Sequence, residues 1–302
     1  MNQPKPLHKG ATVGILSTAR KISIAEIQAA IELLHSWDLK VVLGTTIDLE
    51  DNQFAGDDMT RAMNFQQFMD DENIDAIWCA RGGYGTIRMI DHLDFSRFIQ
   101  KPKWIIGYSD ITVLHAKGQE LGFETAHATM PINVSKNSAE SIDSLRKVLF
   151  GESLKYSVPK VEYNRKGNSS GQLIGGNLSM LYSMTGSKLS LDTTGKILFL
   201  EDLDEYLYHI DRMYHVDRMM MNLKQNKYFE GLSGLIVGGM TDMNDNAVPY
   251  GKNAHQIILD VTSEYNFPIC FDFPAGHLDD NRALIFGKKV NLNVDSKVNL
   301  SF

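Results

Sequence analysis

Short apolar runs alternate with amphipathic segments through the first half of the chain, and this alternation constrains the fold most. Four runs have the length and composition of buried strands: Thr12–Ser17, Leu39–Leu43, Ala76–Ala80 and Trp104–Gly107. Between them, Ser23 and Glu26 predict the capping box of one helix, and Asp57–Asp70 is a second helix with an apolar stripe of Met59, Met63, Phe65 and Phe68. Strands alternating with helices form βαβ units, so we expect an α/β fold with a doubly wound, mostly parallel sheet.

The second half of the chain has a different character. A length of 302 residues exceeds one average domain, and the polar stretch 156–170 is typical of a linker. We therefore predict an N-terminal α/β domain at 1–155, a linker at 156–170 and a smaller, β-rich C-terminal domain at 171–302. Strands are expected there at Lys196–Leu200, Leu235–Val237, Ile269–Phe271 and in the alternating tail after Arg282.

One helical pattern interrupts the strands of the second half. It spans Glu205–Lys224 and carries His209 and His215, which we expect to be solvated on its charged face. Its methionines are expected to make core or subunit contacts: Met213, Met219, Met220 and Met221.

Composition excludes several classes of protein. A net charge of −7 gives no basic stripe of the kind that nucleic-acid binding requires. No run approaches the roughly 18 apolar residues of a membrane span, and Met1–Pro6 leads into a polar stretch, so a cytoplasmic location is expected. Cys79 and Cys270 lie in apolar runs and are expected to be buried packing residues, and no Cys/His spacing resembles a zinc site.

Ser109 follows a buried strand directly. The strand ends at Gly107, and Asp110 opens the next helix, so the turn through Tyr108 should expose the serine hydroxyl beside free helix N–H groups. Nucleophilic serines occupy such strand–turn–helix elbows, although their usual second glycine is Ile111 in this chain. An ordinary helix cap is the alternative interpretation.

A glycine-rich loop, Arg81–Gly85, follows the third predicted strand. Parallel strands place the loops after them at one sheet edge, so this loop and Ser109 should lie at the same edge. Backbone N–H groups of Gly83 and Asp110 would then form an oxyanion hole. The alternatives are a flexible turn and a phosphate loop, although the Gly-Lys-Ser/Thr of a P-loop is absent.

A nucleophilic serine needs a base and a carboxylate that orients the base. His277 follows a buried strand and Gly276, which would let the imidazole project, whereas His115 falls on the helix face opposite Ser109 and His127 suits a pocket wall. Glu201 ends a buried apolar run, which is unusual for a carboxylate unless it is paired. Its alternative is a charge at a helix start beside Asp202 and Asp204, and a solvated acidic turn is favoured there over a metal site.

Six segments in this order resemble the motif series of the LD-carboxypeptidase family. This family of serine peptidases includes muramoyl-tetrapeptide carboxypeptidases and microcin-immunity peptidases. The segments are Arg81–Gly85, Gly107–Asp110, Gly171–Leu178, Ile197–Asp202, Ile210–Met213 and Gly276–His277.

The resemblance implies a role for each candidate residue. Ser109 would be the nucleophile, His277 the general base and then the general acid, and Glu201 the orienting carboxylate, with the oxyanion hole at Gly83 and Asp110. It also implies an α/β domain paired with a smaller β-rich domain, a homodimer, and neither a metal nor a cofactor.

The chain departs from the family pattern at two places. Family members often carry His-Gly-Pro-Met where this chain has His127–Pro131, and smaller or polar residues where Asp279 and Asp280 follow His277. The first difference alters the expected pocket wall behind the nucleophile, and with it the substrate more than the chemistry.

The expected function is a cytoplasmic carboxypeptidase that releases D-Ala from a murein tetrapeptide during wall recycling. Arg81 is the candidate receptor for the substrate carboxylate, with Gly82 and Tyr84 beside it, although a structural salt bridge would also explain Arg81. One alternative is a microcin-type hydrolase of an aminoacyl-nucleotide amide, with Tyr206 or Tyr208 stacking on the base. The other is a small-ligand-binding module without catalysis.

Overall fold

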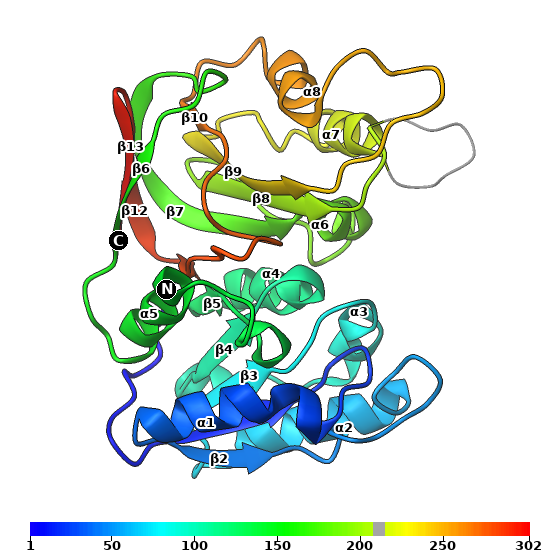
Figure 1. Cartoon of the computed structure of the whole chain (residues 1–302), viewed down its shortest axis with the longest axis vertical. Helices are drawn as coiled ribbons and strands as arrows, with labels where there is room; N and C mark the ends of the chain where they lie inside the picture. The colour runs from blue at the N-terminus through cyan, green and yellow to red at the C-terminus, as the bar shows by residue number, and fades with distance from the viewer. Residues whose placement is uncertain (208–214) are drawn as a thin grey trace. The chain divides into compact units, whose positions relative to one another are not determined.

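The chain divides into two compact units (Figure 1). A computed structural model describes residues 1–207 and 215–302. The first unit comprises Met1–Ser153 and Asp279–Gly287, and the second comprises Leu154–Leu278 and Lys288–Phe302. Each unit is built on one sheet.

The sheet of the first unit has the strand order β11-β5-β4-β3-β1-β2. Five strands are parallel, and only β11 runs antiparallel, against β5. Their bounds are β1 Thr12–Leu16, β2 Lys40–Leu43, β3 Ala76–Cys79, β4 Trp104–Gly107, β5 Thr125–His127 and β11 Leu284–Phe286. The expected doubly wound sheet is therefore confirmed. Because the chain moves outward from β1 in both directions, the sheet has a topological switch point between β1 and β3.

Helices flank this sheet (Figure 1). The five α-helices are α1 Gln28–Ser36, α2 Asp58–Asp70, α3 Thr86–Met89, α4 Thr112–Leu121 and α5 Ala139–Leu149. Short 3₁₀ turns lie at η1 Ile24–Ile27, η2 Ile90–His92, η3 Phe98–Gln100, η4 Ser109–Ile111 and η5 Pro131–Asn133. The capping box predicted at Ser23 and Glu26 is present and opens η1, which leads into α1.

The apolar stripe predicted for α2 is wrong in part. Phe65 and Phe68 are buried, but Met59 and Met63 are 48% and 67% exposed. The face that the helix buries instead includes Arg61, Ala62 and Asn64. Arg61 Nη1 donates to the Thr18 carbonyl, and Asn64 Oδ1 accepts from the Thr46 amide, so both polar side chains make tertiary hydrogen bonds.

The second unit carries a mixed sheet with the order β10-β9-β8-β7-β12-β13-β6. β7 to β10 are parallel, and β7, β12, β13 and β6 are antiparallel. The strands are β6 Lys155–Pro159, β7 Gly167–Asn177, β8 Ile197–Leu203, β9 Gly234–Thr241, β10 Ile269–Cys270, β12 Lys289–Val294 and β13 Lys297–Ser301. Its helices are α6 Leu178–Met184, α7 Val216–Gln225 and α8 Ala254–Val261.

The predicted domain boundaries need two corrections. The stretch 156–170 is not a linker, because most of β6 and the start of β7 lie in it and both strands pair within the second sheet. The predicted C-terminal domain at 171–302 is interrupted, because Asp279–Gly287 belongs to the first unit and supplies β11.

Of the helix predicted at Glu205–Lys224, the described residues show the C-terminal part. Val216–Gln225 forms α7. Tyr208, His209 and Met213 lie outside the described residues. Met219 and Met220 are buried, as expected, and Met221 is 38% exposed. The prediction that His215 is solvated is wrong, because its side chain is buried at the start of this helix.

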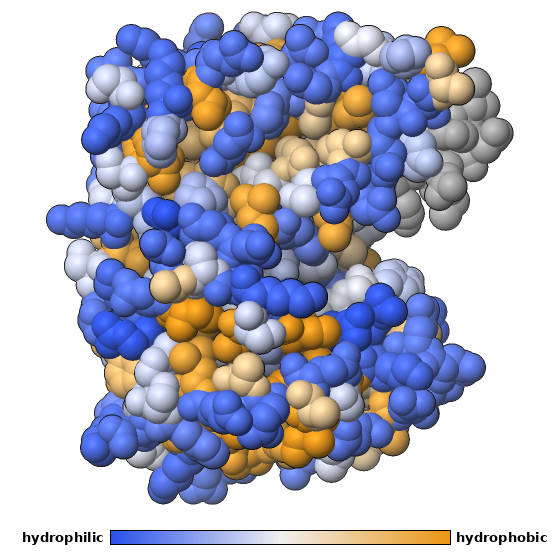
Figure 2. All heavy atoms as spheres, in the orientation of Figure 1, coloured by the Kyte–Doolittle hydropathy of each residue, from blue (hydrophilic) through white to orange (hydrophobic). Residues whose placement is uncertain are grey.

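Figure 2 shows one face of the molecule, on which hydrophilic side chains predominate and apolar ones form smaller patches. Among the described residues, none of the helices combines the length and the apolar character that a membrane span requires. Both cysteines are free and buried. Burial raises the pKa of both thiols, that of Cys270 to about 12, which leaves them unreactive.

β7 lies between the parallel and the antiparallel strands of its sheet, and it has no room for a side chain at Gly175. Gly175 has φ +130°, and a Cβ atom there would lie 2.0 Å from the carbonyl oxygen of its register partner Phe199. We expect Gly175→Ala to lower the free energy of unfolding by about 3 kcal/mol or more, because the two strands must separate. The measurement is urea unfolding followed by circular dichroism.

Gly186→Ala is the matched control. Gly186 also has a positive φ, +79°, but a Cβ atom there would have no other atom within 4 Å. It should show only the conformational loss of about 1 to 2 kcal/mol. Equal losses in the two variants would contradict the steric argument.

Candidate active site

Ser109 lies at the end of β4 in a strained turn. Its φ is +64°, a left-handed conformation that is uncommon for residues other than glycine, and η4 and α4 follow at once. The chain reaches this turn through Gly107, where a Cβ atom would lie 2.7 Å from Ile111. Ile111, which stands in place of the second glycine of the usual elbow, therefore packs back against the first. The local geometry is that of a strand–turn–helix elbow with the serine at its tip.

A buried histidine supports the elbow from below. His115 Nε2 lies 3.0 Å from the Gly107 carbonyl oxygen and Nδ1 lies 2.8 Å from Thr125 Oγ1. Because the carbonyl can only accept, Nε2 carries the proton and Nδ1 accepts from the threonine. Burial lowers the pKa of His115 to about 4, so the ring stays neutral. His115 is thus a positioning group for β4, with both ring nitrogens in hydrogen bonds to Gly107 and Thr125.

The glycine-rich loop contacts Ser109 through Gly82. A Cβ atom on Gly82 would lie 3.0 Å from Ser109 Cβ, 3.1 Å from Oγ and 3.5 Å from the Asp110 nitrogen. Gly83, with φ +109°, instead faces Arg20, whose Cδ would lie 2.4 Å from its Cβ. The expected shared sheet edge for the loop and the serine is therefore present, and Gly82 is the residue that lies against both Ser109 and the next amide.

Asp110 joins the elbow to this loop. Its side chain is buried, and Oδ2 accepts a hydrogen bond of 2.8 Å from the Thr86 amide at the start of α3. Burial raises the pKa of Asp110, and the Thr86 hydrogen bond opposes this shift. The carboxylate thus fixes the end of the glycine-rich loop relative to the residue after the serine.

The other candidate residues of the loop differ in their surroundings. Arg81 Nη1 lies 3.8 Å from Glu26 Oε1 and donates to the Lys21 carbonyl at 3.4 Å. The structural salt bridge that is the alternative role of Arg81 is therefore present, at the long end of the distance range for an ion pair. Tyr84 is 49% exposed.

Glu201 and His277 form a hydrogen-bonded pair in the second unit. His277 Nδ1 lies 2.6 Å from Glu201 Oε2, and the His277 amide donates to the same oxygen at 3.3 Å. The glutamate side chain is fully buried and that of the histidine is 15% exposed. Burial opposes protonation of the ring, but the charge and hydrogen bond of Glu201, together with the charge of Asp202, outweigh it and raise the pKa of His277. Because the carboxylate accepts from Nδ1, Nε2 is left as the basic nitrogen.

Two glycines of β9 make room for this pair. The pairing of β8 with β9 is irregular between Leu200 and Asp202, opposite Gly238 and Gly239. A Cβ on Gly238 would lie 2.4 Å from the Ala275 carbonyl oxygen, which accepts from the Gly239 amide at 2.9 Å. The segment that carries His277 can therefore lie directly on the sheet beside Glu201.

The sequence favours a solvated acidic turn at Asp202, and the structure places this residue on a strand. β8 continues to Leu203, and Asp202 is buried, accepting hydrogen bonds from Asn177 Nδ2 at 2.8 Å and the Ser179 amide at 2.9 Å. Burial, with the neighbouring charges of Glu201 and Glu205, raises its pKa to about 8. The interpretation of this stretch as a solvated turn is wrong for these two residues. Among the described residues, no group of His, Cys, Asp or Glu is arranged to hold a metal ion.

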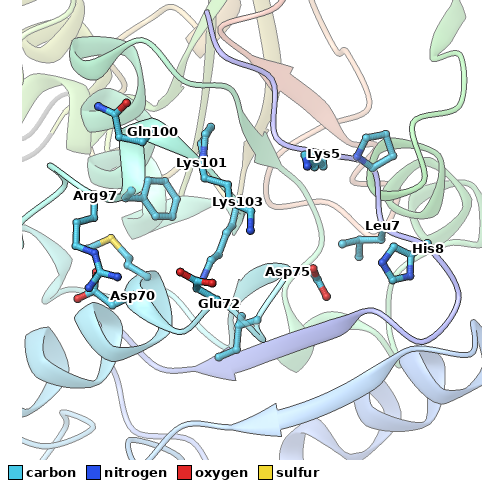
Figure 3. A pocket seen from close by; sticks show the side chains of 15 residues that line it. Lys5, Leu7, His8, Asp70, Glu72, Asp75, Arg97, Gln100, Lys101 and Lys103 are labelled. Atoms are coloured by element: carbon cyan, nitrogen blue, oxygen red, sulfur yellow. The ribbon is translucent and has the colours of Figure 1, made fainter.

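A cavity of about 590 Å³ lies elsewhere in the first unit (Figure 3). Its lining comes from the segments that precede β1, β3 and β4, including His8, Glu72 and Lys101. It is therefore at the amino ends of the strands, whereas Ser109 and the glycine-rich loop are at the carboxyl ends, next to the switch point where open α/β sheets bind ligands.

Comparison with known proteins identifies the family. The LD-carboxypeptidase N-terminal domain matches residues 13–128, and the LD-carboxypeptidase C-terminal domain matches residues 170–292. The chain belongs to the LD-carboxypeptidase family. Members of this family are serine peptidases, and the resemblance inferred from the sequence motifs is confirmed.

Relatives of this LD-carboxypeptidase family member cover nearly its whole length. A probable murein peptide carboxypeptidase of Bacillus subtilis is 31% identical over 98% of this chain and 92% of its own length. The crystal structure of muramoyltetrapeptide carboxypeptidase from Oxalobacter formigenes has a TM-score of 0.86 at 23% identity, covering 96% of this chain and 98% of that one. The structure of MccF in complex with glutamyl sulfamoyl guanosine has a TM-score of 0.85 at 24% identity, covering 98% and 97%. The two structures show that the fold is shared.

The close contact between Gly276 and Glu201 gives a test of the His277 environment. Gly276 has φ +106°, and a Cβ atom there would lie 2.8 Å from Glu201 Oε2. We expect Gly276→Ala to push the Glu201 carboxylate away from the imidazole and to lower the pKa of His277. Burial lowers this pKa, and Glu201 would no longer oppose it. NMR titration of the histidine ring measures this pKa.

Gly251→Ala is the control for this substitution. Gly251 has φ +86° with no atom within 4 Å of a Cβ, so its replacement should leave the His277 titration unchanged. An unchanged pKa in Gly276→Ala would show that the glycine is not needed for the pair.

Proposed function

We propose that the chain is a serine carboxypeptidase that hydrolyses the L,D peptide bond before a terminal D-amino acid, releasing D-Ala from a murein tetrapeptide. The hydrogen-bonded pair of His277 with the buried Glu201 carries this proposal, because an imidazole held on Nδ1 by a carboxylate is the base that a serine nucleophile requires. The left-handed turn at Ser109 and the relative named as a murein peptide carboxypeptidase support it.

In the proposed mechanism, Ser109 Oγ attacks the scissile carbonyl while His277 Nε2 takes its proton. Glu201 fixes the tautomer and stabilises the imidazolium, and the N–H groups of Gly83 and Asp110 stabilise the oxyanion. His277 then protonates the leaving amine of the D-amino acid. Water, deprotonated by the same imidazole, hydrolyses the acyl-enzyme and restores the serine. The position of Gly82 against Ser109 supports this mechanism, since glycine places no side chain in the space beside the hydroxyl.

A substrate with a free carboxylate needs a cation or N–H groups to bind it. We propose that Arg81, with Gly82 and Tyr84 of the same loop, contacts the substrate. The support is their place in the loop that lies against Ser109 and the exposure of Tyr84. Arg81 would have to exchange its distant pairing with Glu26 for the substrate carboxylate.

The alternatives make different predictions for the same protein. A microcin-type hydrolase would cleave an aminoacyl-nucleotide amide; of the two tyrosines considered for stacking, Tyr206 is half-buried beside the β-bridges to His215 and Asn244, and Tyr208 lies outside the described residues. A binding module would retain ligand without turnover.

Replacement of the proposed nucleophile separates enzyme from binder. We expect the wild-type protein to remove one alanine from murein tetrapeptide and Ser109→Ala to reduce turnover by roughly three or more orders of magnitude, because no other group attacks the carbonyl. Mass spectrometry of the muropeptides measures the loss of alanine. Ser36→Ala, at the exposed end of α1, is the control. If the wild-type protein leaves the tetrapeptide intact but cleaves an aminoacyl-nucleotide amide, the microcin-type alternative is supported.

The His277 pairing predicts the pH dependence of that turnover. A general base acts when deprotonated, so kcat/KM should fall as the pH falls through the pKa of His277, which Glu201 holds above the ordinary value of 6.5. In Glu201→Gln the raising charge is lost while burial remains, so the midpoint should move to lower pH and the maximum rate should fall. A pH profile that is the same in both proteins would contradict the assignment of His277 as the base.

The cytoplasmic location and the homodimer expected from the sequence stay predictions. Size-exclusion chromatography with light scattering checks the dimer.

A further inference from the structure

Arg61 is a fully buried arginine beneath the glycine-rich loop. It lies in the first turn of α2, and its side chain has no exposed surface. Transfer of a guanidinium from water to a protein interior is unfavourable unless its donors are paired. An exposed helix position would avoid this loss, so the contacts that Arg61 makes indicate what the burial achieves.

Two of those contacts join different loops at the carboxyl edge of the first sheet, and the others lie at the start of α2. Nη1 donates to the Thr18 carbonyl, after β1, at 2.7 Å and to the Gly85 carbonyl, after β3, at 2.9 Å. Nε donates to the Gly56 carbonyl at 3.2 Å, and Nη2 pairs with Asp58. One planar cation thus holds two loops on either side of the switch point to the start of α2.

The contact with Gly85 is close enough to require glycine. Gly85 has φ +150°, and a Cβ atom there would lie 2.6 Å from Arg61 Nη1 and 3.1 Å from Ala19 Cα. The last residue of the glycine-rich loop is therefore shaped to receive the guanidinium.

A short chain of bonds leads from this contact to Ser109. The residue after Gly85 is Thr86, whose amide donates to Asp110 at 2.8 Å and whose hydroxyl donates to Thr18 Oγ1 at 2.9 Å. At the other end of the same loop, Gly82 lies against Ser109. The loop is thus fixed at one end by Arg61 and Asp110 and contacts the serine at the other.

We propose that Arg61 is a positioning residue that holds the glycine-rich loop in place against Ser109. It touches neither the serine nor any group proposed to react, and acts through the Gly85 and Thr18 carbonyls. The catalytic consequence rests on the proposed function: without Arg61, the loop N–H groups and Gly82 would lose their register with the nucleophile.

The position of the loop can be tested without any substrate. In Arg61→Met the carbonyl bonds are lost while the volume is similar, and we expect amide hydrogen exchange in a peptide covering residues 81–86 to rise at least about tenfold. Arg61→Lys keeps the charge and one donor group, so it should show a smaller rise. It also serves as the test variant if Arg61→Met does not fold.

Lys103→Met is the matched control. Lys103 is a second buried cation in the first unit, and its Nζ donates to carbonyls at the other end of α2, those of Phe68 at 2.9 Å and of Asp71. Its loss removes a comparable buried charge far along the helix from the loop, so exchange at residues 81–86 should stay as in the wild type.

Kinetics on murein tetrapeptide give the second readout. We expect kcat to fall roughly tenfold to a hundredfold in Arg61→Met with KM changed less, with partial recovery in Arg61→Lys and little change in Lys103→Met. Unchanged exchange at residues 81–86, or a fall in kcat no larger than that of Lys103→Met, would overturn the inference. If exchange at residues 81–86 increases in Arg61→Met but the wild-type protein cleaves no amide, the proposed function is overturned while the loop-holding role of Arg61 is supported.

Discussion

The second unit is arranged around a carboxylate that has no exposed surface. Glu201 lies on the interior strand β8, where its burial is tolerable because His277 supplies two donors to one oxygen. Those donors reach it only because the Ala275–His277 segment lies directly on β9 at Gly238 and Gly239. The irregular pairing of β8 with β9 lies at this same point, opposite these two glycines.

Local sequence patterns predicted the first unit well and the second less well. Each parallel strand of the first unit is a short apolar run, because both faces of the sheet are covered, and such runs can be recognised without knowing their partners. β6 is not such a run, because its alternate residues are exposed; this alternation is itself a strand signal, which the interpretation of 156–170 as a linker overlooked. β11 falls in the tail after Arg282 where strands are expected, but its pairing with β5 of the first unit could not be predicted from its own three residues. Met59 and Met63 show the converse error, in which helical spacing suggested a core that the fold does not bury.

The candidate site divides along the same line. Ser109, Glu201 and His277 could be proposed from the sequence because each follows or ends a buried run next to a glycine or an acidic pair, which are local signals. Thr86, Asp202 and Arg61 could not, because their importance comes from bonds to residues distant in sequence. An arginine within a helix ordinarily indicates a solvated face, and only the contacts with Thr18 and Gly85 show otherwise.

The late return of the chain to the first unit affects the order in which the protein can fold. β5 lies inside the first sheet only because β11 covers its outer edge, and β11 is synthesised after nearly all of the second unit. While the ribosome is still making that unit, the nascent first unit has an open edge whose N–H and C=O groups are available to other chains. The first unit can therefore be completed only after most of the second unit has been made, although most of its residues emerge first.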